Sequence, residues 1–486
     1  MKFRAFDENF DLWLHPRDSL LASVETPVYF AYDNIIAPGR VSYALLPEAM
    51  KSIGQLYEDR NHSASIVVSS NEHHDGGPKI TGNIVMGPNT SALVIRPLSL
   101  SEAVTDHVSK YFPKYGANFK AYPNMQYDHV IYRITRVSWN FGVGGPFIDD
   151  PINIEMVAPV PTLYPKLFLQ FDHTYWNANF LDNQSDESKM ISVLEYALVF
   201  WNGVDLYYRR FENPSIRIHI AAIAIATTPA ATPYILKSWV PSLRAYHSDV
   251  ALDESSLFYY DVKDQIPLSM YNIAVTMTKF PLVGKVDGIA MNEAICSNPE
   301  DDGKQRAVAL ISDNGAFGSL KVAAHEVGHV MGLSHDGDKN FACNSGQGFV
   351  MSQETTVEKN SSFFSACSFI EFNKILLARK LECLYNQPKT MAENFRVPLP
   401  GQELSLDEQC QRLGYKEACK NSRYDPCVRL DCTTLRIGSY EHCRLAYHSA
   451  APGSLCGKKN DTEPRFCFEG SCVSSDEWYE KNGKND

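Results

Sequence analysis

Cysteine placement is the feature that most constrains how this 486-residue chain can fold. All twelve cysteines lie between Cys296 and Cys472, and none occurs in residues 1–295. An even number crowded into one part of a chain is typical of disulfide bonding in an oxidising compartment. A cysteine zinc ribbon is disfavoured because the chain has no pair of Cys-x-x-Cys knuckles. The pattern therefore predicts a secreted, extracellular protein, although no signal peptide is evident in the sequence.

Charge and hydropathy exclude several other classes of protein. The chain has 45 basic and 57 acidic residues, a formal charge of −12, and 44 % hydrophobic residues. Net acidity without a basic patch disfavours nucleic acid as a partner. No stretch approaches the ~20 apolar residues that span a bilayer. We therefore expect a globular chain of several domains with no membrane span, and we expect a monomer.

Residues 1–158 have the pattern of a β-rich, cysteine-free domain. Short apolar runs alternate with clusters of Gly, Pro, Asn and Asp, as strands alternate with turns. The expected strands are 63–69, 82–86, 91–95 and 129–133. A Gly- and Pro-rich stretch at 142–161 is the first predicted boundary.

Residues 159–388 predict an α/β domain with a mostly parallel sheet, because strand and helix patterns alternate there. The expected strands are 167–171, 216–226 and 272–278, and the expected helices are 189–211, 319–331 and 369–384. We interpret the acidic stretch 249–264 as a solvated loop. Residues 389–486 are loop-rich and hold eight cysteines, a density typical of a small disulfide-rich module.

The segment from His325 to Asp336 has the spacing of a zinc site. His325 and His329 are four residues apart, so both project from one face of a helix. Gly332 can end the helix and turn the chain, which brings His335 round as a third imidazole and leaves one zinc position open. Glu326, next to a ligand, can then act as general base and acid on water. The spacing predicts one Zn²⁺ per chain and hydrolysis of peptide bonds.

These residues resemble the metzincin metalloproteases, and Asp336 after the third histidine resembles the adamalysin (reprolysin) branch. Similarity extends along the chain: 3–12 and 129–133 resemble propeptide landmarks, and 288–290, 364–368 and 383–386 resemble catalytic-domain landmarks. The segment 399–410 and the eight cysteines after it resemble an ADAMTS disintegrin-like, cysteine-rich module. The resemblance implies a propeptide-like domain at 1–158, a zinc metalloprotease at 159–388 and this module at 389–486. The plan resembles a short ADAMTS-like protease of the arthropod venom or salivary type.

The resemblance also implies roles for residues around the zinc site. Met351 would form a floor under the zinc, and Asp336 would fix the chain after the last ligand. The pairings implied are Cys296 with Cys383 and Cys343 with Cys367. The sequence alone allows three pairings of these four cysteines and leaves the other eight open.

Two departures from the family pattern affect latency and metal content. A zymogen held by a propeptide cysteine on the zinc is impossible here, because no cysteine precedes Cys296. Related proteases often carry a structural calcium, but its glutamate and aspartate positions fall on Lys166 and Asn272, with Asn386 matching. Calcium is therefore doubtful, and we expect the Lys166 ammonium to replace it.

Asn-x-Ser/Thr triplets make the chain a candidate glycoprotein, with acceptors at Asn61, Asn89, Asn183, Asn360 and Asn460. The function expected is a secreted zinc endopeptidase acting on extracellular proteins. One alternative is a toxin-like or exosite binding protein whose cysteine-rich module recognises a partner while the protease is latent. A peptidase that trims single residues is a further alternative, which the surroundings of the motif disfavour.

Overall fold

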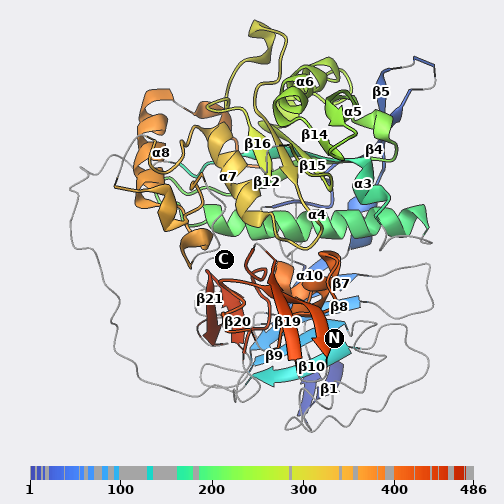
Figure 1. Ribbon diagram of the computed structural model, residues 1–486. Coiled ribbons are helices and arrows are strands. Elements are labelled where there is room, and N and C mark those ends of the chain that lie inside the picture. Colours follow the sequence, from blue (N-terminus) through green and yellow to red (C-terminus); the bar gives the residue numbers. More distant parts are fainter. Residues whose placement is uncertain are drawn as a thin grey trace.

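The fold is described from a computed structural model, in which a long helix, α4, separates a large α/β part from two smaller β parts (Figure 1). The structure describes residues 2–5, 8–11, 15–16, 21–34, 36–37, 39–53, 55–59, 64–69, 79–85, 92–97, 129–134, 161–178, 185–283, 287–338, 342–353, 359–379, 381–388, 399–420, 422–437, 440–446, 448–457, 465–474 and 477.

A seven-stranded sheet in the order β16-β17-β15-β11-β12-β4-β5 forms the centre of the α/β part. Strands β4, β12, β11, β15 and β17 run parallel to one another, and the outer strands β16 and β5 are antiparallel to their neighbours. The central strands are apolar on both faces because helices cover both sides. The bounds are Val28–Asp33 (β4), Val41–Leu45 (β5), Lys166–Phe171 (β11), His219–Ala226 (β12), Ile273–Thr278 (β15), Gly288–Ala290 (β16) and Val308–Ser312 (β17).

Two apolar clusters, one on each face of the sheet, form the core of this part. Helices α4 and α7 pack in the larger cluster, and α5 and α6 in the other. Ser185 begins α4 by accepting a hydrogen bond from the Ser188 backbone, which satisfies a free N–H of the first turn. The bounds are His173–Trp176 (α3), Asp186–Tyr208 (α4), Pro233–Ser238 (α5), Ser248–Asp261 (α6), Leu320–Met331 (α7) and Ala366–Arg379 (α8), with a small hairpin of Trp239–Val240 (β13) and Ala245–Tyr246 (β14).

The interpretation of 249–264 as a loop is wrong, since most of this stretch belongs to α6. Its buried residues Ala251, Leu252, Ser255 and Tyr259 recur at helical spacing, while the acidic residues of the helix are exposed or half-buried. An amphipathic helix with a short apolar face is easily read as a charged loop when charge alone is considered.

The N-terminal region divides between two sheets. Strands β4 and β5 belong to the large sheet, so that sheet crosses the boundary that the sequence predicts near residue 158. A separate six-stranded sheet, in the order β10-β9-β8-β7-β6-β3, contains the other strands apart from the β1–β2 hairpin. The bounds are Lys2–Ala5 (β1), Glu8–Asp11 (β2), His15–Pro16 (β3), Gln55–Asp59 (β6), Ala64–Ser69 (β7), Lys79–Val85 (β8), Ala92–Pro97 (β9) and His129–Ile134 (β10).

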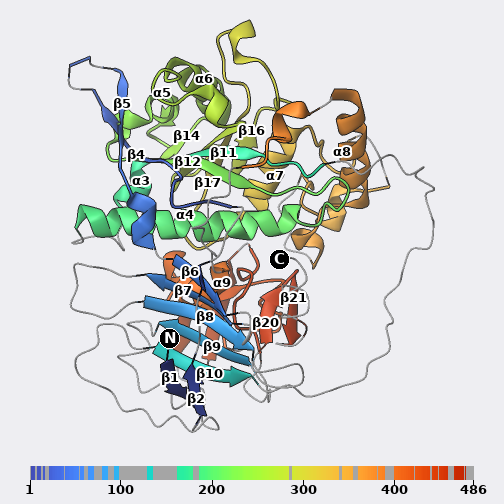
Figure 2. The same cartoon turned by 180° about the vertical axis from the view of Figure 1, so that it is seen from behind.

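The C-terminal module lies beside the six-stranded sheet, on the side of α4 away from the large sheet (Figures 1 and 2). Its elements are Pro400–Glu403 (α9), Leu406–Arg412 (α10), Asp431–Ile437 (β18), Tyr440–Leu445 (β19), Arg465–Phe468 (β20) and Ser471–Ser474 (β21). Four disulfides join Cys410 to Cys432, Cys419 to Cys443, Cys427 to Cys467 and Cys456 to Cys472. Its buried apolar clusters are small and consist largely of these cysteines, which explains why covalent links are needed.

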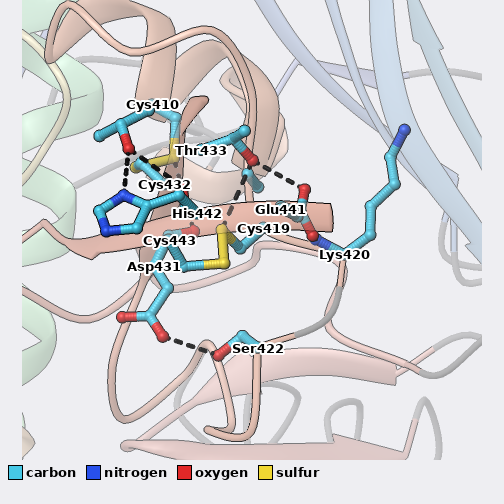
Figure 3. The surroundings of a disulfide bond; sticks show 12 residues. Cys410, Cys419, Lys420, Ser422, Asp431, Cys432, Thr433, Glu441, His442 and Cys443 are labelled. Carbon is cyan, nitrogen blue, oxygen red and sulfur yellow. Dashed lines mark hydrogen bonds between the residues drawn. A yellow bond between two sulfur atoms is a disulfide. The ribbon is translucent and has the colours of Figure 1, made fainter. Parts of the chain in front are cut away.

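One side of the module shows how polar contacts support the disulfides (Figure 3). The Thr433 hydroxyl, beside Cys432, donates to the Glu441 carboxylate at 2.9 Å. The same carboxylate accepts from the Lys420 backbone N–H at 3.1 Å, next to Cys419. The first bond links β18 to β19, and the second ties the segment at Lys420 to β19 beside the disulfide between Cys419 and Cys443.

Candidate metal centre

Helix α7 and the turn after it bring the three predicted zinc ligands together. His325 and His329 lie one helical turn apart on the same face of α7. The helix ends at Gly332, whose φ of 108° is open to glycine and strained for other residues. The chain then turns, and His335 faces the other two imidazoles.

The three imidazole rings converge on one point. Their centroids are 4.5 Å apart for His325 and His329, 4.6 Å for His329 and His335, and 5.2 Å for His325 and His335. One ring nitrogen from each lies within 4.8 Å of the others, and the Nε2 atoms of His329 and His335 are 3.1 Å apart. Three imidazole nitrogens around one point fit the three-histidine ligand set of a catalytic zinc ion.

In two of the rings, a hydrogen bond on the side away from the metal position determines which ring nitrogen is free to bind a metal. Nδ1 of His325 donates to the Val350 carbonyl at 2.7 Å, and Nδ1 of His329 donates to the Leu333 carbonyl at 2.8 Å. With Nδ1 protonated, Nε2 of each ring keeps its lone pair for a metal. Burial lowers the pKa of His325 to about 3 and of His329 to about 4, so both rings are neutral near pH 7.

Glu326 lies beside the histidines on α7 and is buried, with 6 % of its surface exposed. Burial raises the pKa of its carboxyl to about 8, and a cation on the neighbouring histidines would lower it again. A Cβ placed on Gly288 of β16 would lie 2.7 Å from both Cγ and Oε1 of Glu326. Gly288 therefore leaves room for the carboxylate next to the edge strand, a role that the sequence reasoning did not assign.

Met351 lies against α7 under the ligands. Its sulfur is 2.9 Å from where a Cβ on Gly328 would be, so the helix approaches Met351 closely only because residue 328 is glycine. The Met351 carbonyl accepts from the Asp336 backbone N–H at 2.9 Å, which joins the two predicted supporting residues directly. Gly328 was also missed, although a glycine between two histidine ligands in a helix interior is a readable signal.

Asp336 and its neighbours hold the chain that follows the third histidine. The Ser365 hydroxyl donates to Oδ1 of Asp336 at 2.5 Å, and Ser345 donates to the Asp336 carbonyl at 2.7 Å. Glu371 of α8 accepts from the backbone and hydroxyl of Ser334, at 3.1 and 2.8 Å. Neither Ser365 nor Glu371 was given a role from the sequence, because they lie 29 and 37 residues away from the residues they bond.

Two disulfides brace this region. The structure joins Cys343 to Cys367, which ties the loop before Met351 to the start of α8. It joins Cys296 to Cys383, which ties the chain after β16 to the segment after α8. No cysteine of the chain is free.

At the implied calcium position, the Asn272 side chain bridges two backbone groups. The Asn272 side-chain oxygen accepts from the Lys166 backbone N–H at 3.0 Å, and its amide nitrogen donates to the Cys383 carbonyl at 3.3 Å. An N–H group of Asn272 thus faces the Cys383 carbonyl. The replacement of calcium by the Lys166 ammonium stays a prediction.

Of the predicted glycosylation sites, only Asn360 lies within the described residues. It is partly buried in a 3₁₀ turn, and its amide nitrogen donates to the Gln347 carbonyl at 3.0 Å. Asn61, Asn89, Asn183 and Asn460 lie outside the described residues.

None of the helices in the described ranges is both long and apolar enough to span a membrane.

Comparison with known proteins gives two family matches. Residues 259–388 match the Reprolysin (M12B) family zinc metalloprotease, and residues 400–473 match ADAMTS cysteine-rich domain 2. An "A disintegrin and metalloproteinase with thrombospondin motifs like" protein of Bombyx mori is 28 % identical over 97 % of this chain and 72 % of its own length. "Venom metalloproteinase 3" of Eulophus pennicornis is 23 % identical over 68 % of this chain and 72 % of its own. "A disintegrin and metalloproteinase with thrombospondin motifs 16" of Mus musculus is 34 % identical, over 38 % of this chain and 14 % of its own.

Proposed function

We propose, from the premise that this chain is a zinc metalloendopeptidase with a reprolysin-family catalytic domain and an ADAMTS cysteine-rich domain, that it hydrolyses extracellular proteins with Glu326 as general base and acid. The observation that carries the proposal is the placement of Glu326, buried on α7 beside three converging imidazoles. Neither the binding-protein alternative nor single-residue trimming has an observation of this kind in its favour.

His325, His329 and His335 would hold the zinc ion. A bound zinc ion supplies Lewis-acid activation of water and of the scissile carbonyl. The chain contributes three imidazoles, two of them oriented by the carbonyls of Val350 and Leu333. These second contacts reduce the rotation of the rings and so pre-organise the site before a metal arrives.

Glu326 would move the proton in both halves of the reaction. As a carboxylate it accepts the proton of the attacking water, and as a carboxylic acid it gives that proton to the departing amine. Its burial suits this exchange, because a pKa raised toward neutral pH reduces the free-energy difference between the carboxylate and the carboxylic acid. No covalent intermediate is needed.

The substrate would bind along β16. Within the described residues this strand pairs only with β17, so its other edge is open next to Glu326. An extended peptide can add to such an edge as an antiparallel strand, with backbone hydrogen bonds that tolerate many sequences. Gly288 then has a second use, because a side chain there would push the carboxylate away from the peptide.

Six disulfides support an extracellular location, since such bonds persist in oxidising compartments. The relative named as a venom metalloproteinase extends this proposal to a secreted, toxin-like protease. We expect the protein to act as a monomer. The substrate class proposed is extracellular protein.

The test replaces Glu326 and measures metal and activity separately. The Glu326→Gln variant should bind zinc as the parent does, because the three histidines are unchanged, and lose about 10²–10⁴-fold in peptide hydrolysis. Zinc content by mass spectrometry and turnover of a quenched peptide library are the two measurements. Glu293→Gln, at an exposed glutamate whose backbone contacts α7, serves as the control. Turnover near the parent value in Glu326→Gln would contradict the assigned role.

A further inference from the structure

We propose that residues 21–53 are a permanent part of the protease domain, and that a cut between Ile134 and Pro161 leaves them bound as a separate chain. This segment, called here the N-terminal strap, contains β4, β5 and a 3₁₀ helix at Ala49–Ile53. The inference goes beyond the proposed hydrolysis and concerns which parts of the chain make up the working enzyme.

The strap is attached first by backbone hydrogen bonds. Strand β4 runs parallel to β12, with Val28 opposite Ile223 and Ala31 opposite Ala226. Backbone N–H groups of β12 and the next residue donate to strap carbonyls: Ile220 to Leu21 at 2.6 Å, Ile223 to Pro27 at 2.9 Å and Thr227 to Ala31 at 3.0 Å. The strap therefore satisfies donors that lie on the edge of a buried strand.

The strap also contributes side chains to both faces of the sheet. Leu21, Val28 and Met50 are at most 3 % exposed and belong to the larger apolar cluster, together with α4 and α7. Ala31 and Val41 belong to the cluster on the other face. Because the strap buries apolar side chains on both faces of the sheet, its removal would expose apolar surface on both faces.

Three polar contacts complete the attachment. Gln265, after α6, donates from Nε2 to the Val41 carbonyl at 2.9 Å and accepts from the Tyr43 N–H at 3.0 Å. The Tyr43 hydroxyl donates to Gln170 of β11 at 3.0 Å, and Gln170 is fully buried. Loss of the strap would leave the oxygen of a buried amide without this partner, which is costly.

The sequence of β12 shows that it is not built as an outer strand. Residues 219–226 read His-Ile-Ala-Ala-Ile-Ala-Ile-Ala, with no Lys, Asp, Glu, Pro or Gly. Outer strands normally carry such residues, because an apolar exposed edge pairs with other chains. Strand β5 is the outer strand instead; it also lacks these residues, but at five residues with only Val41 buried it offers a shorter and less apolar edge than the eight residues of β12. The protease domain thus needs the strap to protect β12.

The rest of the N-terminal region is attached differently. Strands β6–β10 pair with one another and with β3, and within the described residues none of them pairs with a strand of 161–474. A cut after β10 would leave the strap and β6–β10 on one fragment, and only the strap part of that fragment belongs to the large sheet.

The test cuts the folded full-length chain in place. One recognition site for a sequence-specific protease is inserted within 135–160 and a second between Ile53 and Gln55. After both cuts, residues 1–53 should co-elute with the protease domain in gel filtration at high salt. The exchange of the Ile220, Ile223 and Thr227 amides, followed by hydrogen–deuterium mass spectrometry, should stay as slow as in the uncut protein. Elution of the fragment on its own would overturn the proposal.

A substitution in the strap tests whether the cut fragment is retained by its pairing with β12 or by some other contact. Ala31→Arg, introduced in the same doubly cleavable chain, should release the fragment and speed exchange of the β12 amides, because Ala31 is fully buried. Ile36→Arg, at a side chain that is 94 % exposed, should behave as the parent. If the Ala31→Arg chain is folded before the cuts and its fragment is still retained after them, with rapid exchange in β12, binding lies elsewhere and the proposal fails.

Discussion

The N-terminal strap and the C-terminal module contact the same protease domain, but they are attached by different chemistry. The strap has no cysteine and joins the large sheet through a backbone ladder and buried apolar side chains. The module is held together by four disulfides, adds Leu404 and Ala451 to the larger apolar cluster of the domain, and makes polar contacts with it: Arg412 donates to the Gly315 carbonyl at 2.8 Å, and Arg210 pairs with Glu469 at 2.7 Å. Both regions bury apolar side chains against the domain, but only the strap joins its backbone ladder, whereas the module has little core of its own and depends on covalent links within it.

The difference between the strap and the module predicts that introducing a charge at a buried position of the strap causes the largest loss of stability of the protease domain. Val28→Asp places an unpaired carboxylate at a side chain that is 1 % exposed and should cost about 3–5 kcal/mol in the unfolding of the protease domain. Tyr32→Asp, at a side chain on the same strand that is 38 % exposed, is the matched control and should cost far less. Calorimetry measures both. Equal small effects would show that the strap is not part of this core.

The next largest effect concerns the module. Replacing Cys427 and Cys467, both 2 % exposed, with serine should lower the stability of the module by about 2–5 kcal/mol. The transition of the protease domain and its turnover of short peptides should remain near the parent values. The measurement is a thermal scan that resolves two transitions, and a parallel fall of both would contradict the distinction drawn between the two regions.

A smaller effect is expected at the contact between module and domain. Arg412→Ala removes the bond to the Gly315 carbonyl, in the loop before α7, and should cost about 1.5–3 kcal/mol of docking. The control is Arg429→Ala, whose guanidinium lies over the Tyr424 ring inside the module. Limited proteolysis of the sequence between the two parts reports docking, and identical digestion of both variants would count against the contact.

The ion pair between Arg210 and Glu469 should matter less. Their side chains are 21 % and 28 % exposed, so water and salt weaken the attraction. Glu469→Ala should cost about 1 kcal/mol or less, and the cost should shrink as salt is added. A cost that salt leaves unchanged would indicate packing rather than charge.

The smallest expected effect concerns calcium at the position occupied by Lys166 and Asn272. Calcium or a calcium-selective chelator should leave the melting temperature of the protein unchanged, because the Asn272 amide already joins Lys166 to the Cys383 carbonyl. The double variant Lys166→Glu with Asn272→Asp should become less stable and regain stability on calcium addition, since carboxylates suit this ion. A rise in the parent's melting temperature with calcium would refute this account.

Local patterns predicted the candidate site better than they predicted its supports. The spacing of His325, Glu326 and His329 is a property of one helix, and Gly332 alone accounts for the turn to His335. Ser365 and Glu371 support the same turn from distant parts of the chain, and no spacing relates them to it. Helix α6 was misread for a related reason, because its buried side chains are evident only against the sheet that covers them.

The sequence by itself determined the alternation of strand and helix, the convergence of three histidines with Glu326, and the concentration of disulfides near the C-terminus. Each of these depends on residues close together in the chain, where helical and strand periodicity fix direction. Only the tertiary structure decided that residues 21–53 complete the sheet beside β12, how the eight module cysteines pair, and that Gly288 leaves room for Glu326. Those contacts join residues far apart in sequence, and many arrangements satisfy the same local pattern until burial of both faces of one sheet selects among them.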